Sequence, residues 1–396
     1  MVVVQEIKYI KHGDCNKGGG FENLKIKTSF LSCFDFLGGK KMNILKKYGL
    51  TERFINESSM YPDLNLARVI AQYKGLYKIV TTKGEQFAQI SGKLRYETTE
   101  LAKLPAVGDY VMISCQSQED LALIQCILTR KSVFLRTAVG VSEQAQVVAA
   151  NVDIVFLCMS LNNNYSLNRL ERYLAIAWDS GATPVIVLTK SDLCPNLQAI
   201  IAEVEQASGF AQIITTSMYQ DNIDKFKSYL SKGLTTAFIG SSGVGKSTLI
   251  NQILGETILN TSEIGNADKG RHTTTGRELF PCPFGGAVID TPGMRELGIQ
   301  SLDLVKSFAD LEELIQQCKF TDCTHTNEPG CAIQKAIAAG IISPRRFDSY
   351  IKLKNESSYQ GLNSKQIETQ KLERMFKEVG GMKNARRFAK DKKHKN

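Results

Sequence analysis

The stretch TTAFIGSSGVGKSTLINQIL occupies residues 235–254 and carries the strongest fold signal in the chain. An apolar, strand-like run at 235–240 is followed by the loop Gly240-Ser-Ser-Gly-Val-Gly-Lys246-Ser247-Thr248, and a helical run begins at Leu249. This is the pattern of a phosphate-binding loop in the strand–loop–helix setting that it requires. A plain glycine turn, the alternative, does not explain the lysine and serine that directly follow the last glycine.

The residues of this loop suggest how phosphates and a magnesium ion would be held. The glycines let the backbone wrap closely around a phosphate, and the helix N-terminus adds a positive dipole end. We expect Lys246 to bridge the β- and γ-phosphates and the Ser247 hydroxyl to coordinate Mg²⁺. The nucleotide-binding residues predicted here are Gly240, Ser241, Ser242, Gly243, Val244, Gly245, Lys246, Ser247 and Thr248.

The surrounding pattern predicts the sheet that presents this loop. VDIVFLCMSL at 152–161 is a continuous apolar run, typical of a buried parallel strand. Strand and helix patterns then alternate, with helices at 167–179 and 197–207 and strands at 184–190, 211–217 and 235–240. Such alternation predicts a doubly wound α/β sheet, in which ligands bind at the carboxyl ends of the strands.

Two segments after the loop are expected to complete the phosphate site. Asp290, at the end of the apolar run GGAVID, would reach Mg²⁺ through water, and Gly293 would give its N–H to the γ-phosphate. An ordinary Asp-Thr-Pro-Gly turn is the alternative. GRHTTTG at 270–276 lies between the phosphate loop and Asp290, and one of its threonine hydroxyls can complete the magnesium shell. We expect Thr274 to be this ligand, with Thr273 as the next candidate.

A base-reading motif ends the strand at 184–190. In Thr189-Lys190-Ser191-Asp192, the aspartate can accept hydrogen bonds from guanine N1–H and the exocyclic amine. Adenine offers no such pair, so it would leave the carboxylate unpaired. Helix capping by Ser and Asp is the alternative. The predicted guanine site comprises Thr189, Lys190, Ser191, Asp192 and, by a backbone contact from the next strand end, Ser217.

The region before this sheet has a different pattern. Between about residues 66 and 136, five short strand-like runs alternate with turns that contain glycine. Five short strands within about 70 residues fit a small closed barrel such as an OB-fold, which often binds oligonucleotides. Basic residues are scattered through the stretch; they are either a solvated face or an RNA contact: Lys74, Lys78, Lys83, Lys93 and Arg95.

A metal-binding pattern follows the sheet. Cys318, Cys323, His325 and Cys331 give the spacing C-x4-C-x-H-x5-C, and three thiolates with one imidazole satisfy tetrahedral Zn²⁺ without an open position. We therefore expect one structural zinc ion per chain, pinning helical stretches at 302–317 and 333–339. A disulfide, the alternative, would leave a third cysteine unexplained. The other seven of the ten cysteines are scattered singly, as in a reducing compartment.

Composition narrows the remaining classes of protein. With 396 residues and 43% hydrophobic side chains, the chain can form two or three domains with real cores. No run approaches the roughly 20 apolar residues of a membrane helix, and no signal pattern opens the chain, so we expect a cytoplasmic location without membrane contact. The net charge is +9, and residues 383–396 hold seven Lys or Arg against one Asp. Such a tail is either solvated or bound to a polyanion.

These patterns predict a multidomain chain. Residues 1–41, with GGG and GGKK, would be a disordered extension or the product of a start upstream of the true initiator Met42, which we favour. An OB-fold-type RNA-binding domain would span 42–136, and a P-loop GTPase domain 137–300. Residues 301–396 would form a zinc-binding helical domain with a basic tail.

The motifs occur in an unusual order. Most GTPases run from the phosphate loop to the base reader, but here the reader at 189–192 precedes the loop at 240. The same pocket can still form, because each motif keeps its place at a strand end. With Val107-Gly108-Asp109, AANVD at 149–153 and the Cys/His cluster, the chain resembles the circularly permuted GTPases of the RsgA family over about residues 42–390.

The resemblance implies GTP hydrolysis stimulated by the small ribosomal subunit, in the late maturation of that subunit (30S). Its implied partners are this subunit with its rRNA and GTP or GDP, and its implied cofactors are Mg²⁺ with GTP and zinc at the four positions named above. We expect a monomer. Thr189 departs from the usual asparagine, but its hydroxyl can still tie the base-reading loop to the phosphate loop.

The expected catalytic group is His272. Met294 follows DTPG where many GTPases place a glutamine that orients water, and a thioether cannot replace it. His272 in GRHTTT is the nearest polar candidate, and the resemblance agrees; contact with RNA or solvent is the alternative. The motifs disfavour two other functions. A P-loop phosphotransferase needs no guanine reader, and an RNA-binding module with a degenerate nucleotide site would not retain Lys246, Ser247 and Asp290.

Overall fold

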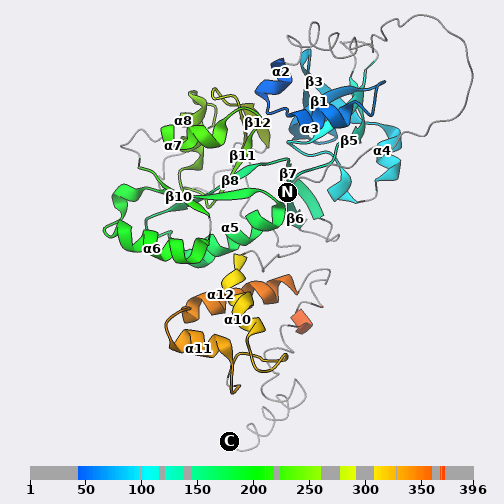
Figure 1. Cartoon of the computed structure of the whole chain (residues 1–396). Coiled ribbons are helices and arrows are strands. Elements are labelled where there is room, and N and C mark those ends of the chain that lie inside the picture. The colour runs from blue at the N-terminus through cyan, green and yellow to red at the C-terminus, as the bar shows by residue number, and fades with distance from the viewer. Residues whose placement is uncertain are drawn as a thin grey trace, which may run out of the picture. The chain divides into compact units, whose positions relative to one another are not determined.

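The structure is a computed structural model whose chain divides into residues 1–41 and 42–396 (Figure 1). It describes residues 43–98, 100–115, 121–137, 145–209, 211–217, 223–259, 277–290, 307–326, 328–358, 366 and 368–370. The predicted extension at 1–41 and the basic tail at 383–396 lie outside these residues. So do His272, Thr273, Thr274, Gly293 and Met294.

The first described domain is a closed five-stranded barrel, as the strand pattern predicts. After helices α2 (Asn43–Lys47) and α3 (Glu52–Ser58) come β1 (Asn65–Tyr73), β2 (Leu76–Thr81), β3 (Gly84–Ile90), β4 (Tyr110–Ser114) and β5 (Ala122–Ile127). Helix α4 (Gly92–Glu97) and the 3-10 turn η1 (Leu101–Lys103) connect β3 to β4. The barrel closes because β4 pairs antiparallel with both β5 and β1. Small and branched side chains of these strands fill its interior: Ala67, Val69, Ile79, Val111 and Ile124.

The second domain contains the predicted doubly wound sheet. Its parallel strands are β8 (Ile154–Ser160), β9 (Thr183–Thr189), β10 (Gln212–Thr215), β11 (Thr235–Gly240) and β13 (Ala287–Asp290), to which β12 (Glu278–Pro281) adds an antiparallel edge. Helices α5 (Leu167–Ser180) and α6 (Leu197–Ser208) cover one face, and α8 (Lys246–Leu254) with the short α7 (Asp224–Lys227) and η3 (Ser228–Leu230) cover the other (Figure 1).

Alternation along the strands explains the two covered faces. On β8, Val155, Leu157 and Met159 join the core shared with α5, whereas Phe156 and Cys158 face the core shared with α8. All five side chains are fully buried, which accounts for the unbroken apolar run in the sequence. The strand order β10-β9-β8-β11-β13-β12 places the ends of β9, β11 and β13 along one edge.

The barrel and the α/β sheet are continuous. β1 pairs with β12 at Ala71 and Glu278, so the two sheets share one strand order. A hairpin of β6 (Val133–Thr137) and β7 (Ala145–Ala150), which the sequence patterns did not predict, leads from the barrel into β8. At this junction Gly108 adopts φ +94°, and its carbonyl accepts hydrogen bonds from Arg68 Nε at 3.2 Å and Asn151 Nδ2 at 3.1 Å.

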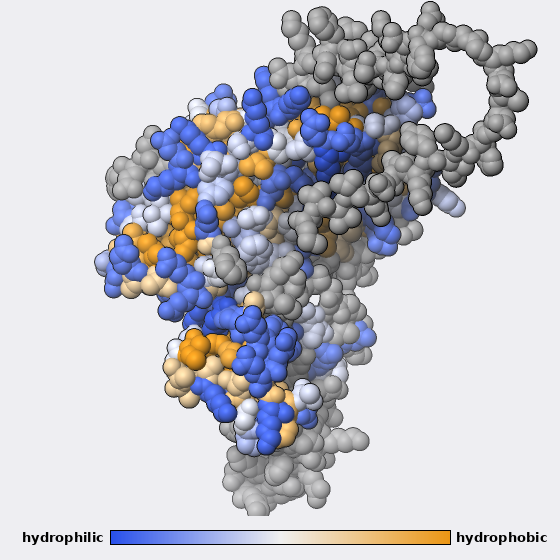
Figure 2. All heavy atoms as spheres, in the orientation of Figure 1, coloured by the Kyte–Doolittle hydropathy of each residue, from blue (hydrophilic) through white to orange (hydrophobic). Residues whose placement is uncertain are grey.

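The C-terminal part is helical, as predicted. It comprises α10 (Ala309–Gln316), α11 (Ala332–Ala338) and α12 (Pro344–Ser357), of which α12 was not predicted. Their shared core includes Phe308, Leu311, Ile333, Tyr350 and Leu353. Figure 2 shows hydrophobic residues in small groups among hydrophilic ones on the visible face of the molecule. None of the helices in the described ranges is long and apolar enough to span a bilayer.

Candidate nucleotide site and metal centre

The loop after β11 has the backbone that a phosphate cradle needs. A Cβ on residue 240 would come within 2.5 Å of the Cys158 carbonyl oxygen, so glycine lets the ends of β8 and β11 approach. Gly243 and Gly245 adopt φ of +74° and +95°, which other residues rarely tolerate. Gly245 is the N-cap of α8, so the loop ends at a helix N-terminus.

Lys246 lies over the loop that it follows. Its ammonium donates hydrogen bonds to the carbonyl oxygens of Gly240 at 2.6 Å and Ser241 at 2.7 Å. The positive charge is therefore held within the loop, where phosphate oxygens of a nucleotide would lie. Ser247 and Thr248 follow in the first turn of α8 and are half-buried.

The base-reading motif is in direct contact with this loop. The Thr189 hydroxyl donates to the Val244 carbonyl at 2.7 Å, and the Lys190 ammonium donates to the Gly243 carbonyl at 2.9 Å. Lys190 has φ +56°, which turns the chain sharply out of β9. The structure thus brings together two segments that are separated by about fifty residues in the sequence.

The remaining predicted residues lie at the same edge of the sheet. The Ser191 N–H donates to the Thr216 carbonyl at 3.1 Å, which joins the motif to the chain that continues into Ser217. Asp192 is solvent-exposed in the 3-10 turn η2 (Ser191–Leu193). Asp290 ends β13, the parallel neighbour of β11. The positions of His272, Thr274 and Gly293 fall outside the described residues.

One contact to the loop has no counterpart in the motifs. Arg169, in the first turn of α5, donates from Nη1 to the Ser241 hydroxyl at 2.8 Å. No sequence signal marks this arginine, because its contact depends on how α5 packs beside the loop.

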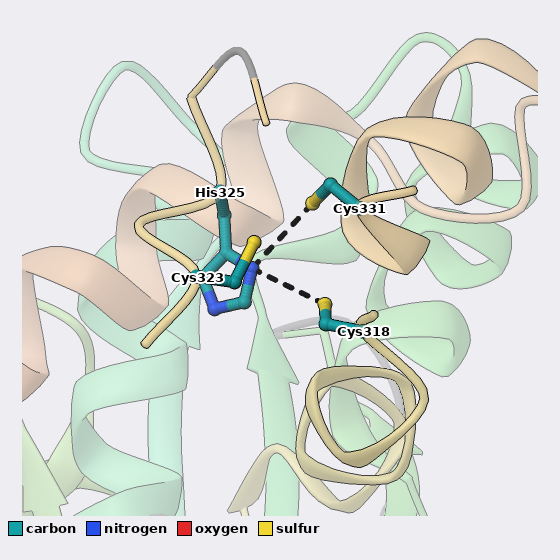
Figure 3. A group of neighbouring side chains, drawn as sticks. All are labelled: Cys318, Cys323, His325 and Cys331. Atoms are coloured by element: carbon teal, nitrogen blue, oxygen red, sulfur yellow. Dashed lines mark hydrogen bonds between the residues drawn. The ribbon is translucent and has the colours of Figure 1, made fainter. Parts of the chain in front are cut away.

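The predicted metal ligands form a compact cluster. Figure 3 shows the side chains of Cys318, Cys323, His325 and Cys331 converging, and their ligand atoms all lie within 4.8 Å of one another. His325 Nδ1 is 3.5 Å from the sulfurs of both Cys318 and Cys331. In a tetrahedral site with Zn–S of about 2.3 Å and Zn–N of about 2.0 Å, neighbouring N and S ligands are about 3.5 Å apart. The residues therefore fit zinc.

Backbone groups around the cluster favour thiolates. The N–H groups of Ala332 and Gln334 each lie 3.4 Å from a sulfur, that of Cys318 and Cys331 respectively. The Gln334 side chain donates to the carbonyl of His325, a residue with φ +60°, at 2.6 Å. These donors hold the ligands in place from a second layer, as metal sites require.

The pKa shifts differ among the side chains of the cluster. Burial, with the neighbouring thiols Cys331 and Cys318, raises the pKa of Cys323 to about 11. Burial and then the nearby Lys354 lower the pKa of His325, so its imidazole is neutral and can coordinate a metal. Burial acts against ionisation of Cys318 as well, but hydrogen bonds from the Ala332 and Ile333 N–H groups lower the pKa of this thiol. A divalent cation would let Cys323 ionise beside it.

A buried ion-pair network connects the helices of the C-terminal part to α5. Glu171 on α5 is 2% exposed and accepts hydrogen bonds from Arg345 at 3.1 Å and Arg346 at 3.3 Å. Arg346 also forms a bidentate pair with Asp310 of α10, at 2.7 and 2.8 Å. The exposed side chain of Asn168 accepts from Arg345 at 2.7 Å.

Comparison with known proteins agrees with this architecture. The sequence model of the RsgA GTPase family matches residues 127–300. "Small ribosomal subunit biogenesis GTPase RsgA 2" of Lactiplantibacillus plantarum is 49% identical over 353 residues, which cover 89% of this chain and 99% of that protein. "Small ribosomal subunit biogenesis GTPase RsgA" of Opitutus terrae is 43% identical over 306 residues, 74% of this chain and 83% of its own length.

Solved structures have the same fold. YjeQ from Thermotoga maritima superposes with a TM-score of 0.54 at 26% identity, covering 74% of this chain and 98% of its own. YloQ, described as a circularly permuted GTPase, superposes with a TM-score of 0.52 at 24% identity, covering 74% and 95%. With a base-reading strand that precedes the phosphate-loop strand and with relatives that match over nearly their whole length, the chain belongs to the RsgA GTPase family.

Proposed function

We propose that this chain is a GTP hydrolase that binds the small ribosomal subunit and hydrolyses GTP to GDP and phosphate during late maturation of that subunit. One observation carries the nucleotide assignment: Thr189 and Lys190 of the base-reading motif are hydrogen-bonded to Val244 and Gly243 of the phosphate loop. A guanine and its phosphates would lie across these two joined segments. The names of the relatives, which refer to small-subunit biogenesis, support the choice of partner.

Each described residue has a role in this proposal. Asp192 would accept from guanine, with Ser191 and Ser217 beside it, and the loop from Gly240 to Thr248 would hold the phosphates. Lys246 would move from the loop carbonyls to the β- and γ-phosphates. Mg²⁺ bound with GTP would neutralise phosphate charge, held by Ser247 and, as we infer from the motif, by Thr274 and through water by Asp290.

The zinc ion would be structural, because the four side chains Cys318, Cys323, His325 and Cys331 fill a tetrahedral shell and leave no position for water. We also propose that the protein works as a monomer in the cytoplasm, with its barrel and basic tail against rRNA. Light scattering of the purified chain, with and without GTP, tests the monomer.

GTP turnover measured with and without purified small ribosomal subunits tests the proposal. We expect slow turnover alone and a marked increase with subunits, and no comparable turnover of ATP. Asp192→Asn reverses the hydrogen-bonding pattern offered to the base, so GTP affinity should fall on the order of 100-fold and xanthosine triphosphate should bind instead. Equal turnover of GTP and ATP, or an Asp192→Asn variant with unchanged base preference, would contradict the assignment.

We propose that His272 orients the attacking water, because Met294 cannot. His272→Ala should retain GTP affinity, since the base and phosphate contacts remain, and should lose the subunit-stimulated part of turnover. His272→Gln, which retains a hydrogen-bonding side chain, is the matched variant and should retain part of the stimulation. Unchanged stimulated turnover in His272→Ala would assign water positioning to another group.

A further inference from the structure

Arg169 is placed at the phosphate loop by the topology of the sheet. Cys158 near the end of β8 is the register partner of Gly240, where β11 enters the loop. α5 begins seven residues after β8, capped by Ser166, whose hydroxyl accepts from the Arg169 N–H at 3.4 Å. The first turn of α5 therefore lies beside the first residues of the loop, and Arg169 reaches Ser241.

Ser241 is held from two sides by cations. Its hydroxyl accepts from the Arg169 guanidinium at 2.8 Å, and its carbonyl accepts from the Lys246 ammonium at 2.7 Å. The residue is 9% exposed, so these contacts are shielded from water. A hydrogen bond from a charged donor is stronger than a neutral one, and in a shielded position it fixes its acceptor.

The helix that carries Arg169 is itself anchored. Glu171, two residues further along α5, accepts hydrogen bonds from Arg345 and Arg346 of α12. The Arg169 guanidinium also donates to the Asn164 carbonyl at 3.4 Å, which joins it to the loop before α5. The backbone that carries Arg169 is therefore held in place on both sides of this residue.

We propose that Arg169 is a positioning residue for the phosphate loop: it fixes Ser241, and through it the backbone that would wrap the phosphates. The inference rests on the proposed nucleotide site. It extends that site to a helix outside all of the GTPase motifs. The reaction itself does not pass through Arg169, so the loss of this residue acts first on nucleotide affinity.

A double-mutant cycle tests the pair, using Arg169→Ala, Ser241→Ala and the double variant of the full chain. Affinities for fluorescent GDP and a non-hydrolysable fluorescent GTP analogue are measured by titration. We expect each single variant to weaken binding about three- to tenfold, and the double variant to be no weaker than the weaker-binding single variant, because both remove one interaction. KM for GTP should rise with kcat nearly unchanged. Arg169→Lys should restore part of the affinity.

Asn168→Ala is the matched control. It lies next to Arg169 on α5 and loses a contact to Arg345 but none to the loop, so affinity should remain at the wild-type value. Wild-type affinity in Arg169→Ala, or single effects that multiply in the double variant, would overturn the inference. A fall in the melting temperature of Arg169→Ala without a change in KM would overturn it as well. Lys246→Ala separates the two proposals: if it still binds nucleotide normally, the nucleotide site itself is wrong.

Discussion

The Thr189 hydroxyl donates a hydrogen bond of 2.7 Å to the backbone carbonyl of Val244, and this bond joins the base-reading motif to the phosphate loop. The usual residue at the position of Thr189 in GTPases is asparagine, whose amide can donate in the same way. Thr189 is 6% exposed, so the bond is shielded from competing water. The Thr189 hydroxyl therefore supplies a donor at the position where most GTPases have an amide.

Thr189→Val should weaken guanine-nucleotide binding. Valine has nearly the same shape but no donor, so the Val244 carbonyl loses this partner while the packing remains. A neutral hydrogen bond of this kind contributes about 0.5–1.5 kcal/mol, which corresponds to a two- to tenfold increase in Kd. Titration with a fluorescent GDP analogue measures it. Thr189→Ser, which retains the hydroxyl, should bind as the wild type does; if Val and Ser variants bind alike, the bond has no role in affinity.

The fold could be predicted where local pattern and chemistry coincide. The strand predicted at 235–240 is β11, with the same bounds, because an apolar run meets a glycine loop that admits few backbones. The five barrel strands and their closure into a small barrel were predicted too, but not which strands pair to close it, since the β1–β4 pairing joins residues more than forty positions apart. β12 is only four residues long and contains Pro281, so it has too little pattern to be predicted.

The site could be predicted only as far as its motifs extend. The four candidate metal ligands could be recognised because thiols and an imidazole at close spacing have few other uses. Arg169 could not be predicted because, in the sequence, it cannot be distinguished from a solvent-exposed arginine on an amphipathic helix. Only the position of α5 beside the phosphate loop shows its contact. The same is true of Glu171, a buried carboxylate whose partners Arg345 and Arg346 come from α12.

Gly108→Ala should destabilise the junction between the barrel and the α/β sheet. A Cβ there would lie 2.1 Å from the Ala150 carbonyl oxygen, and φ is +94°. The backbone cannot yield easily, since Ala150 is fully buried and its N–H is bonded to the Val107 carbonyl at 3.0 Å. We expect a loss of about 3 kcal/mol or more in the free energy of unfolding, measured by urea denaturation.

Gly75→Ala is the control for this prediction. Gly75 has φ +75°, but no atom lies within 4 Å of the added Cβ, so only the backbone term applies. Its cost should be about 1–2 kcal/mol. Equal losses in the two variants would mean that the approach to Ala150 is not a constraint.

The Glu171–Arg346 pair should behave as a coupled unit. Arg346→Met leaves Glu171 buried with Arg345 alone, and Glu171→Met leaves Arg346 without one of its two carboxylates. Removing one partner of a buried pair typically costs about 3–5 kcal/mol, whereas replacing both by apolar residues costs much less. The double variant should therefore unfold at a higher temperature than Arg346→Met. Additive losses would show that the two side chains do not depend on one another.

Removal of zinc should affect the C-terminal helices and spare nucleotide binding. The cluster lies between α10 and α11, and apolar side chains enclose its four side chains only in part. Without the ion, nothing would compensate the charge of thiolates at this spacing, so this part of the chain should loosen. Metal analysis of the native protein should find one zinc per chain, and Cys318→Ser should lose it and become sensitive to protease beyond residue 307.

Cys115→Ser, outside the cluster, is the control and should retain both zinc and protease resistance. GDP affinity should remain unchanged in both variants, because no described zinc ligand contacts the phosphate loop; a loss of GDP binding that accompanies zinc release would instead make the metal part of the nucleotide site.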